Sequence, residues 1–125
     1  MADNEKETKS LNETIRNRRS NRAISEEEVT EEELEKLLMA AHLAPSCFNN
    51  QPWRLIPVLQ SRKLEKIKES LSGGNYWAKK APTIIAVVSR REIDCDLSHG
   101  RVYYRFDCGL AVENLLLQAT DMGLV

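Results

Sequence analysis

Two arginines and a serine alternate within the sequence RNRRSNR, as Arg18, Ser20 and Arg22. If this segment is extended, the three side chains point to the same side, because successive residues of an extended chain face opposite ways. Two guanidinium groups and a hydroxyl on one side suit a phosphate, since arginine binds oxygens through a planar fork of N–H donors. An ordinary basic surface patch would show the same spacing, so both interpretations stand at this point.

A second set of hydrogen-bonding side chains lies just before a predicted strand, in HLAPSCFNNQPWRLIPVL, residues 42–59. Ser46, Asn49, Asn50 and Gln51 are close together there. Asparagine and glutamine present both a donor and an acceptor, which suits the edge of a heterocyclic ligand. Local turn and capping chemistry is the simpler explanation of these residues taken alone, because serine and asparagine are common in turns.

The elements that must position these groups follow from the hydrophobic pattern. Helical periodicity predicts helices near residues 10–18, 30–44, 61–71 and 101–122, and apolar runs predict strands at 53–59 and 83–89. Thr30 and Glu33 have the spacing of a capping box, and Pro45 is expected to stop that helix. The run TIIAVVS is apolar on both faces, which favours a central strand. The order of elements predicts an α+β fold with helices around a small sheet.

Composition limits the possible partners. The chain has 125 residues and a formal net charge of −1, which fits one domain over residues 1–125 and gives no sign of a nucleic acid partner. No apolar run reaches the roughly 18 residues of a membrane span, so no membrane association is expected. The charged start MADNEKETKSLNE lacks the core of a signal peptide, and residues 1–9 are expected to be flexible.

Three cysteines, at positions 47, 95 and 108, are odd in number and form no CxxC pair. This pattern favours free thiols in a reducing cytoplasm over a disulfide scaffold or a zinc site. The two histidines, His42 and His99, lack the spacing of metal ligands. No metal site is therefore expected.

Several segments together resemble the nitroreductase family of flavin-dependent oxidoreductases. They are RRSNR, APSCFNNQPW, GGN, the AP before an apolar strand, and DCGLAVENLLLQATDMGL, in the family's order from about Thr14 to Leu124. The resemblance implies a nitroreductase-like fold with a long dimer-forming helix, and FMN bound at the interface of a homodimer. It also implies that electrons pass from NAD(P)H through FMN to a small-molecule acceptor, such as a nitroaromatic or a quinone.

The resemblance further implies which residues bind the flavin. Arg18, Arg19 and Ser20 match positions that contact the phosphate and ribityl chain, and Arg22 matches a basic residue near the pyrimidine end of the ring. The positions matching the loop that the second subunit lays against the isoalloxazine ring are Pro45, Ser46, Cys47 and Asn49, with Gln51 in the same motif. The positions matching the segment that hydrogen-bonds the ring edge are Asn75 and Lys79. No catalytic side chain is implied, since the flavin carries the redox chemistry.

The sequence ends at DMGLV, where Gly123 is expected to close the long helix and Leu124–Val125 look like the beginning of another strand. Members of the family continue with a further strand, loop and helix that add flavin contacts. The resemblance therefore implies that this C-terminal part of the family domain is absent here. It leaves an alternative open, in which a shortened nitroreductase-like protein dimerises or binds flavin without catalytic turnover.

Overall fold

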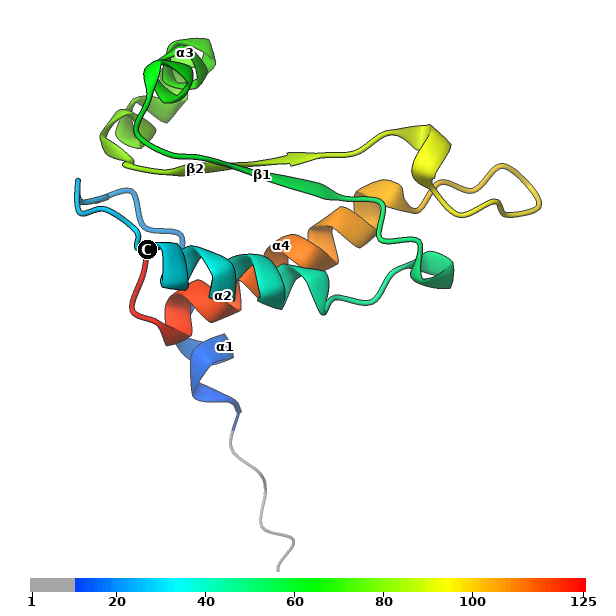
Figure 1. Ribbon diagram of the computed structural model, residues 1–125. Helices are drawn as coiled ribbons and strands as arrows, with labels where there is room; N and C mark the ends of the chain where they lie inside the picture. The colour runs from blue at the N-terminus through cyan, green and yellow to red at the C-terminus, as the bar shows by residue number, and fades with distance from the viewer. Residues whose placement is uncertain (1–10) are drawn as a thin grey trace, which may run out of the picture.

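The computed structural model describes residues 11–125, so the expected flexible segment at 1–9 lies outside the described residues. The helices are α1 (Glu13–Asn17), α2 (Glu31–His42), α3 (Arg62–Ser70) and α4 (Tyr104–Asp121), and the strands are β1 (Arg54–Val58) and β2 (Ile84–Val88). Short 3₁₀ segments lie at η1 (Cys47–Asn49), η2 (Gly73–Lys80) and η3 (Arg91–Ile93). Helices α2 and α4 pack together below the two-stranded antiparallel sheet of β1 and β2, and α3, which connects the two strands together with η2, lies beyond one end of that sheet (Figure 1). The α+β prediction is confirmed.

Helix α2 begins as the sequence predicts. The Thr30 hydroxyl accepts a hydrogen bond from the Glu33 amide at 3.2 Å, and the Glu33 carboxylate accepts one from the Thr30 amide at 2.8 Å. This reciprocal capping box satisfies two amides that the first helical turn leaves without partners. The bonds from Thr30 also hold the pKa of the Glu33 carboxyl below its ordinary value. The helix ends at His42, shortly before Pro45.

The core lies where α2, α4 and the start of β1 meet. Its buried residues are Ala41, Ala44, Trp53 and Ala111. Three alanines allow the two helix backbones to approach, and the Trp53 side chain, only 1% exposed, fills the space between the helices and the sheet. The indole N–H of Trp53 donates to Nδ1 of His42 at 3.2 Å, so the one polar atom of this buried side chain has a partner.

The prediction that residues 83–89 form a central strand is wrong for the described chain. Among residues 11–125, β2 pairs only with β1, antiparallel, with Arg54 opposite Val88 and Pro57 opposite Ile85. Val87 and Val88 are 38% and 47% exposed. An apolar run indicates that both faces can be covered, but a central strand needs paired backbone on both edges, which the run does not specify. Pro57 has no backbone N–H to donate, which agrees with its place in β1, a strand paired on one edge only among residues 11–125.

The ends of α1 and α4 are set by capping. Helix α1 begins at Glu13, later than the predicted Ser10, because Asn12 Oδ1 accepts from the amides of Thr14 and Ile15. Helix α4 closes at Gly123 as predicted. Gly123 has φ +75°. Its amide donates to the Thr120 carbonyl at 3.1 Å, and the Leu124 amide donates to the Ala119 carbonyl at 2.8 Å. These two bonds form a Schellman motif, which glycine favours because it has no Cβ.

Within the described part of the chain, no helix combines the length and apolar character that crossing a membrane requires.

Candidate functional site

The arginine segment leaves α1 in an extended conformation. Arg18, the C-cap of α1, has φ −54° and ψ 127°, and its guanidinium donates to the Ser20 hydroxyl at 3.4 Å. The predicted alignment of these two side chains on one side is therefore confirmed. Arg18 Nε also lies 3.8 Å from Glu113 Oε1 on α4, which draws the guanidinium toward the middle of that helix. The result is an accessible cation beside a hydroxyl.

Arg19 and Arg22 are arranged differently from this pair. The Arg19 guanidinium turns back and donates to the carbonyls of Arg16 and Arg18 at 2.6 and 2.8 Å. It thereby satisfies carbonyl groups at the C-terminal end of α1, where cations are favoured. Both bonds come from Nη1, so Nε and Nη2 of Arg19 keep their N–H donors for an anion. Arg22 is exposed on the extended segment that leads to α2.

The loop at residues 45–51 follows α2 and has an unusual backbone. Phe48, Asn49 and Gln51 have positive φ values of 51°, 55° and 46°, in the left-handed region that L-residues seldom adopt. The Ser46 hydroxyl accepts from the Gln51 amide at 2.9 Å, so one predicted site residue takes part in turn chemistry. Pro45, Asn49 and Gln51 are exposed. The loop therefore presents polar side chains on a backbone that other contacts must hold in place.

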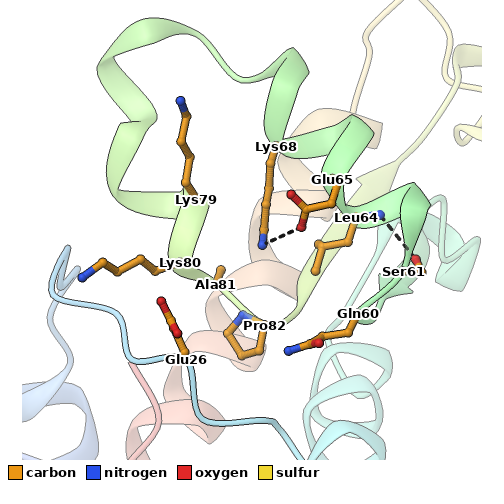
Figure 2. Close-up of a pocket in the computed structure, with 10 residues that line it drawn as sticks. All are labelled: Glu26, Gln60, Ser61, Leu64, Glu65, Lys68, Lys79, Lys80, Ala81 and Pro82. Atoms are coloured by element: carbon orange, nitrogen blue, oxygen red, sulfur yellow. Dashed lines mark hydrogen bonds and ion pairs between the residues drawn. The ribbon is translucent and has the colours of Figure 1, made fainter.

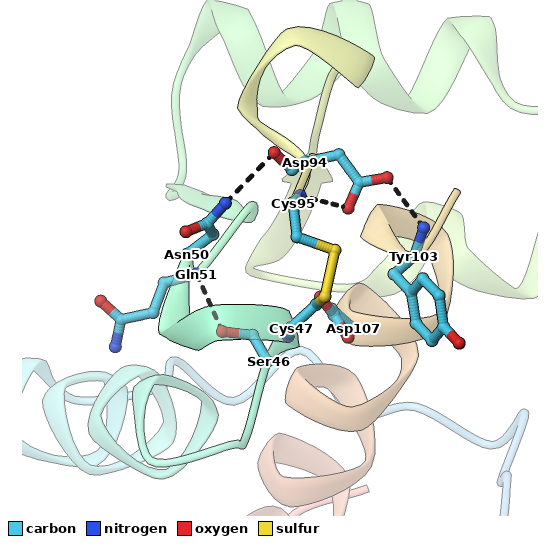
Figure 3. Close-up of a disulfide and its surroundings, with 8 residues drawn as sticks. All are labelled: Ser46, Cys47, Asn50, Gln51, Asp94, Cys95, Tyr103 and Asp107. Carbon is cyan, nitrogen blue, oxygen red and sulfur yellow. Dashed lines mark hydrogen bonds between the residues drawn. A yellow bond between two sulfur atoms is a disulfide. The ribbon is translucent and has the colours of Figure 1, made fainter. Parts of the chain in front are cut away.

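Those contacts come from the connection between β2 and α4 (Figure 3). Cys47 forms a disulfide with Cys95, with Cα atoms 5.7 Å apart. The Cys47 amide donates to the Asp107 carboxylate at 3.0 Å, and the Asn50 side-chain amide donates to the Asp94 carbonyl at 3.1 Å. Asp107 is only 2% exposed, so its carboxylate binds the loop from within the protein.

The expectation of three free thiols is wrong for Cys47 and Cys95, and only Cys108 is free. The two paired cysteines are 48 residues apart in sequence, and the fold, not a local motif, brings them together. An odd number of cysteines leaves one unpaired but does not exclude one bridge.

Asp94 stabilises the segment that carries Cys95. Its carboxylate accepts from the amides of Cys95 and Tyr103, each at 2.8 Å. Burial raises the pKa of the Asp94 carboxyl, but hydrogen bonds from the amides of Tyr103, Tyr104 and Cys95 outweigh it and leave the pKa below its ordinary value. The ionised carboxylate thus stabilises the connection that carries Cys95.

This lowered pKa predicts a pH dependence of stability. The stabilisation by Asp94 is complete above the unfolded pKa of about 4 and is lost as the pH falls through the lower folded value. We expect Asp94→Asn to reduce the free energy of unfolding at pH 6 and to differ less from the unchanged protein at pH 2.5. Urea denaturation at both pH values measures the difference, with Asp96→Asn, an exposed neighbour, as the control. An equal difference in the free energy of unfolding at the two pH values would contradict this role of the Asp94 carboxylate.

Asn75 and Lys79 lie in η2 and line one cavity of about 290 Å³ beside α3. The side-chain amide of Asn75 donates to the Ser72 hydroxyl at 2.9 Å. A neighbouring cavity of about 530 Å³ shares Lys79, Lys68 and Glu65 with the first, and the Lys68 ammonium lies 3.1 Å from the Glu65 carboxylate (Figure 2). The sequence motifs did not point to Lys68. Its spacing from Glu65, three residues on one helix, was the available signal.

The predicted site residues therefore fall into three places. They are the segment 18–22 beside α1 and α4, the loop 45–51 at the end of α2, and η2 beside α3. Among residues 11–125, no hydrogen bond or ion pair joins any two of these places. The carboxylates of Asp94 and Asp107 both accept hydrogen bonds from backbone amides.

Comparison with known proteins gives consistent matches. The model of the Nitroreductase family matches residues 15–75. A protein of Archaeoglobus fulgidus, provisionally described as an NADH dehydrogenase/NAD(P)H nitroreductase, is 34% identical over 113 residues, covering 88% of this chain and 61% of the relative. The FMN reductase (NAD(P)H) of Bacillus subtilis is 30% identical over 120 residues, covering 91% of this chain and 47% of the relative.

A solved structure gives the same result for the fold. A crystal structure of an oxidoreductase containing FMN superposes with a TM-score of 0.79 and 32% identity, covering 98% of this chain and 64% of that one. The chain thus spans about half to two thirds of the length of the proteins it matches. Nearly all of the described chain has a counterpart in them.

Proposed function

The chain belongs to the nitroreductase family, and from this we propose that it binds FMN and acts as an NAD(P)H-dependent oxidoreductase. The observation that carries the proposal is the likeness of 98% of the chain to an oxidoreductase that contains FMN. The identity to an FMN reductase supports the same cofactor and NAD(P)H as electron donor. The acceptor we propose is a small molecule of the nitroaromatic or quinone class.

The Arg18 segment fits the phosphate end of FMN. The Arg18 guanidinium and the Ser20 hydroxyl lie 3.4 Å apart and offer several donors to phosphate oxygens. Glu113 lies 3.8 Å from Arg18, beyond hydrogen-bond range, so a phosphate can replace this weak carboxylate contact. Arg19 can add a second cation through Nε and Nη2, which its carbonyl bonds do not use, and Arg22 lies further along the same segment.

Asn75 and Lys79 fit the edge of the flavin ring. They line one cavity, and together they provide an amide donor, a carbonyl acceptor and a positive charge. A cation at the ring edge stabilises the negative charge that the ring gains on reduction. In this proposal the two residues hold and tune the ring, and neither transfers a proton.

The loop at 45–51 supports a homodimer with the flavin at the interface. The loop is not joined to the Arg18 segment within one chain, so a second copy is proposed to bring its loop against the ring. Three large apolar side chains near that loop are accessible for such a contact: Met39, Leu43 and Phe48 are 62%, 74% and 76% exposed. Exposed apolar groups of this size are typical of protein interfaces.

Bound FMN would supply the redox chemistry by taking a hydride from NAD(P)H and passing electrons to the acceptor. The residues of the chain would bind the phosphate, orient the ring and close one face of it with the loop. This requires no catalytic acid or base and no metal ion. The reaction is proposed to take place in the cytoplasm, the compartment that holds the NAD(P)H pool.

The experiment that tests this function is the visible absorbance of the purified protein with added FMN, followed by anaerobic addition of NADPH. We expect the flavin to remain with the protein through gel filtration and its visible bands to bleach on reduction, faster than free FMN under the same conditions. Retained flavin without faster bleaching would support flavin binding without turnover. A protein that retains no FMN would overturn the proposed cofactor.

A further inference from the structure

The loop segment 46–51 is attached to the rest of the protein at one end of α2 by three long-range links. They are the Cys47–Cys95 disulfide, the bond from the Cys47 amide to Asp107, and the bond from the Asn50 side chain to the Asp94 carbonyl. All three lead to residues 94–107, the connection into α4 (Figure 3). The disulfide is the only covalent link of the three.

The backbone of this segment needs such links. Phe48, Asn49 and Gln51 all have positive φ, and the Phe48 side chain is 76% exposed, so its own packing cannot hold it there. Strained residues of this kind persist only where the surrounding structure constrains them. When the disulfide is cut, the segment keeps its internal hydrogen bonds, but only two long-range hydrogen bonds still attach it to residues 94–107, one of them from the exposed side chain of Asn50. Loss of the disulfide therefore allows the segment to relax.

The disulfide is also placed for exchange with thiols. Cys47 is half-buried, whereas Cys95 is only 5% exposed, so an incoming thiolate can reach the Cys47 sulfur first. Attack there forms a mixed disulfide between the reagent and Cys47, breaks the Cys47–Cys95 bond, and releases Cys95 as a thiolate, which takes up a proton. The second sulfur of a small dithiol then displaces Cys47, and the reagent becomes a cyclic disulfide. A glutathione-type disulfide reverses the change and leaves as two thiols.

We propose that Cys47–Cys95 is a reversible thiol–disulfide switch that orders segment 46–51 when oxidised and releases it when reduced. A disulfide in a reducing compartment is typically transient or regulatory, which agrees with this role. The consequence for the cofactor rests on the proposed function: the oxidised form presents a fixed loop to the flavin and binds FMN more tightly. Cellular thiol balance would then set the fraction of protein competent to bind flavin.

Hydrogen exchange measured by mass spectrometry tests the switch. The protein is equilibrated in glutathione buffers from fully reduced to fully oxidised, and alkylation counts its thiols. We expect one alkylated cysteine in oxidised protein and three in reduced protein. Amides of residues 49–51 should lose protection about tenfold on reduction, while those within α2 stay unchanged.

Three cysteine variants distinguish the disulfide from other causes of a change in exchange. Cys47→Ala and Cys95→Ala should both show, in every buffer, the hydrogen exchange that residues 49–51 have in the reduced protein. Agreement between the two variants separates loss of the disulfide from a fold defect caused by replacing the buried Cys95. Cys108→Ser removes the free thiol and should still switch. Three alkylated cysteines in the most oxidising buffer, or equal protection in both states, would overturn the proposal.

FMN titration of the two states separates this proposal from the function. We expect the dissociation constant to rise about tenfold on reduction, and equal affinity in both states would overturn the link between switch and cofactor. Failure of FMN to bind either state would instead overturn the proposed function, and exchange at residues 49–51 would still decide whether the switch exists.

Discussion

Replacement of Trp53 by alanine is expected to lower the free energy of unfolding by about 3–5 kcal/mol. The side chain is 1% exposed and lies in the cluster with Ala41, Ala44 and Ala111. Small alanine side chains cannot move to refill the space, so the substitution leaves a cavity where α2, α4 and β1 meet. A loss of this size is a large part of the roughly 5–15 kcal/mol that stabilises a typical domain.

Urea denaturation followed by far-ultraviolet circular dichroism measures this loss. Trp53→Phe keeps most of the volume and loses the bond to His42, so it should cost only about 1 kcal/mol. Tyr76→Ala is the matched surface control, because Tyr76 is 72% exposed, and it should change stability by less than about 0.5 kcal/mol. A Trp53→Ala variant as stable as Tyr76→Ala would show that this cluster is not the core.

Replacement of Arg18 by alanine is expected to weaken FMN binding by about tenfold to a hundredfold, the value of one strong charge-assisted hydrogen bond. The guanidinium lies beside the Ser20 hydroxyl and is held only loosely by Glu113. Arg18→Lys keeps the charge but loses the planar fork of donors. Its dissociation constant for FMN should therefore lie between those of the unchanged protein and Arg18→Ala. Stability should change little, since Arg18 makes no buried hydrogen bond.

Fluorescence quenching of FMN on titration with protein gives the dissociation constants. Arg62→Ala serves as the matched control, because Arg62 is an exposed arginine at the start of α3, away from the Arg18 segment. If Arg18→Ala and Arg62→Ala bind FMN equally well, Arg18 does not hold the phosphate. A loss that grows at low salt and shrinks at high salt would further identify the contact as ionic.

The helices and their ends could be predicted from the sequence because their signals are local. Thr30 and Glu33 form the capping box within one turn, and α4 closes at Gly123 through bonds from the Gly123 amide to Thr120 and from the Leu124 amide to Ala119. The start of α1 was missed by a few residues because Asn12, itself a strong cap, competes with Ser10. The side-by-side placement of Arg18 and Ser20 also follows from local geometry.

Contacts between distant residues could not be predicted in the same way. The Cys47–Cys95 disulfide spans 48 positions, and the bond from Cys47 to Asp107 spans 60. Residue type alone does not identify a partner for Asp107, and it predicted a free thiol at each cysteine. Only the packing of α2 against α4 brings these groups within bonding distance.

The sequence by itself therefore determined the family, the order of elements and the residues proposed to bind FMN, because these depend on motifs and on short-range periodicity. The tertiary structure decided the pairing of β2, the turn of Arg19 back onto its own helix, and the links that fix the loop at 45–51. These features depend on which surfaces meet when the chain folds. The sequence pattern indicates which residues favour burial or hydrogen bonding, but it does not indicate which distant residues they will contact.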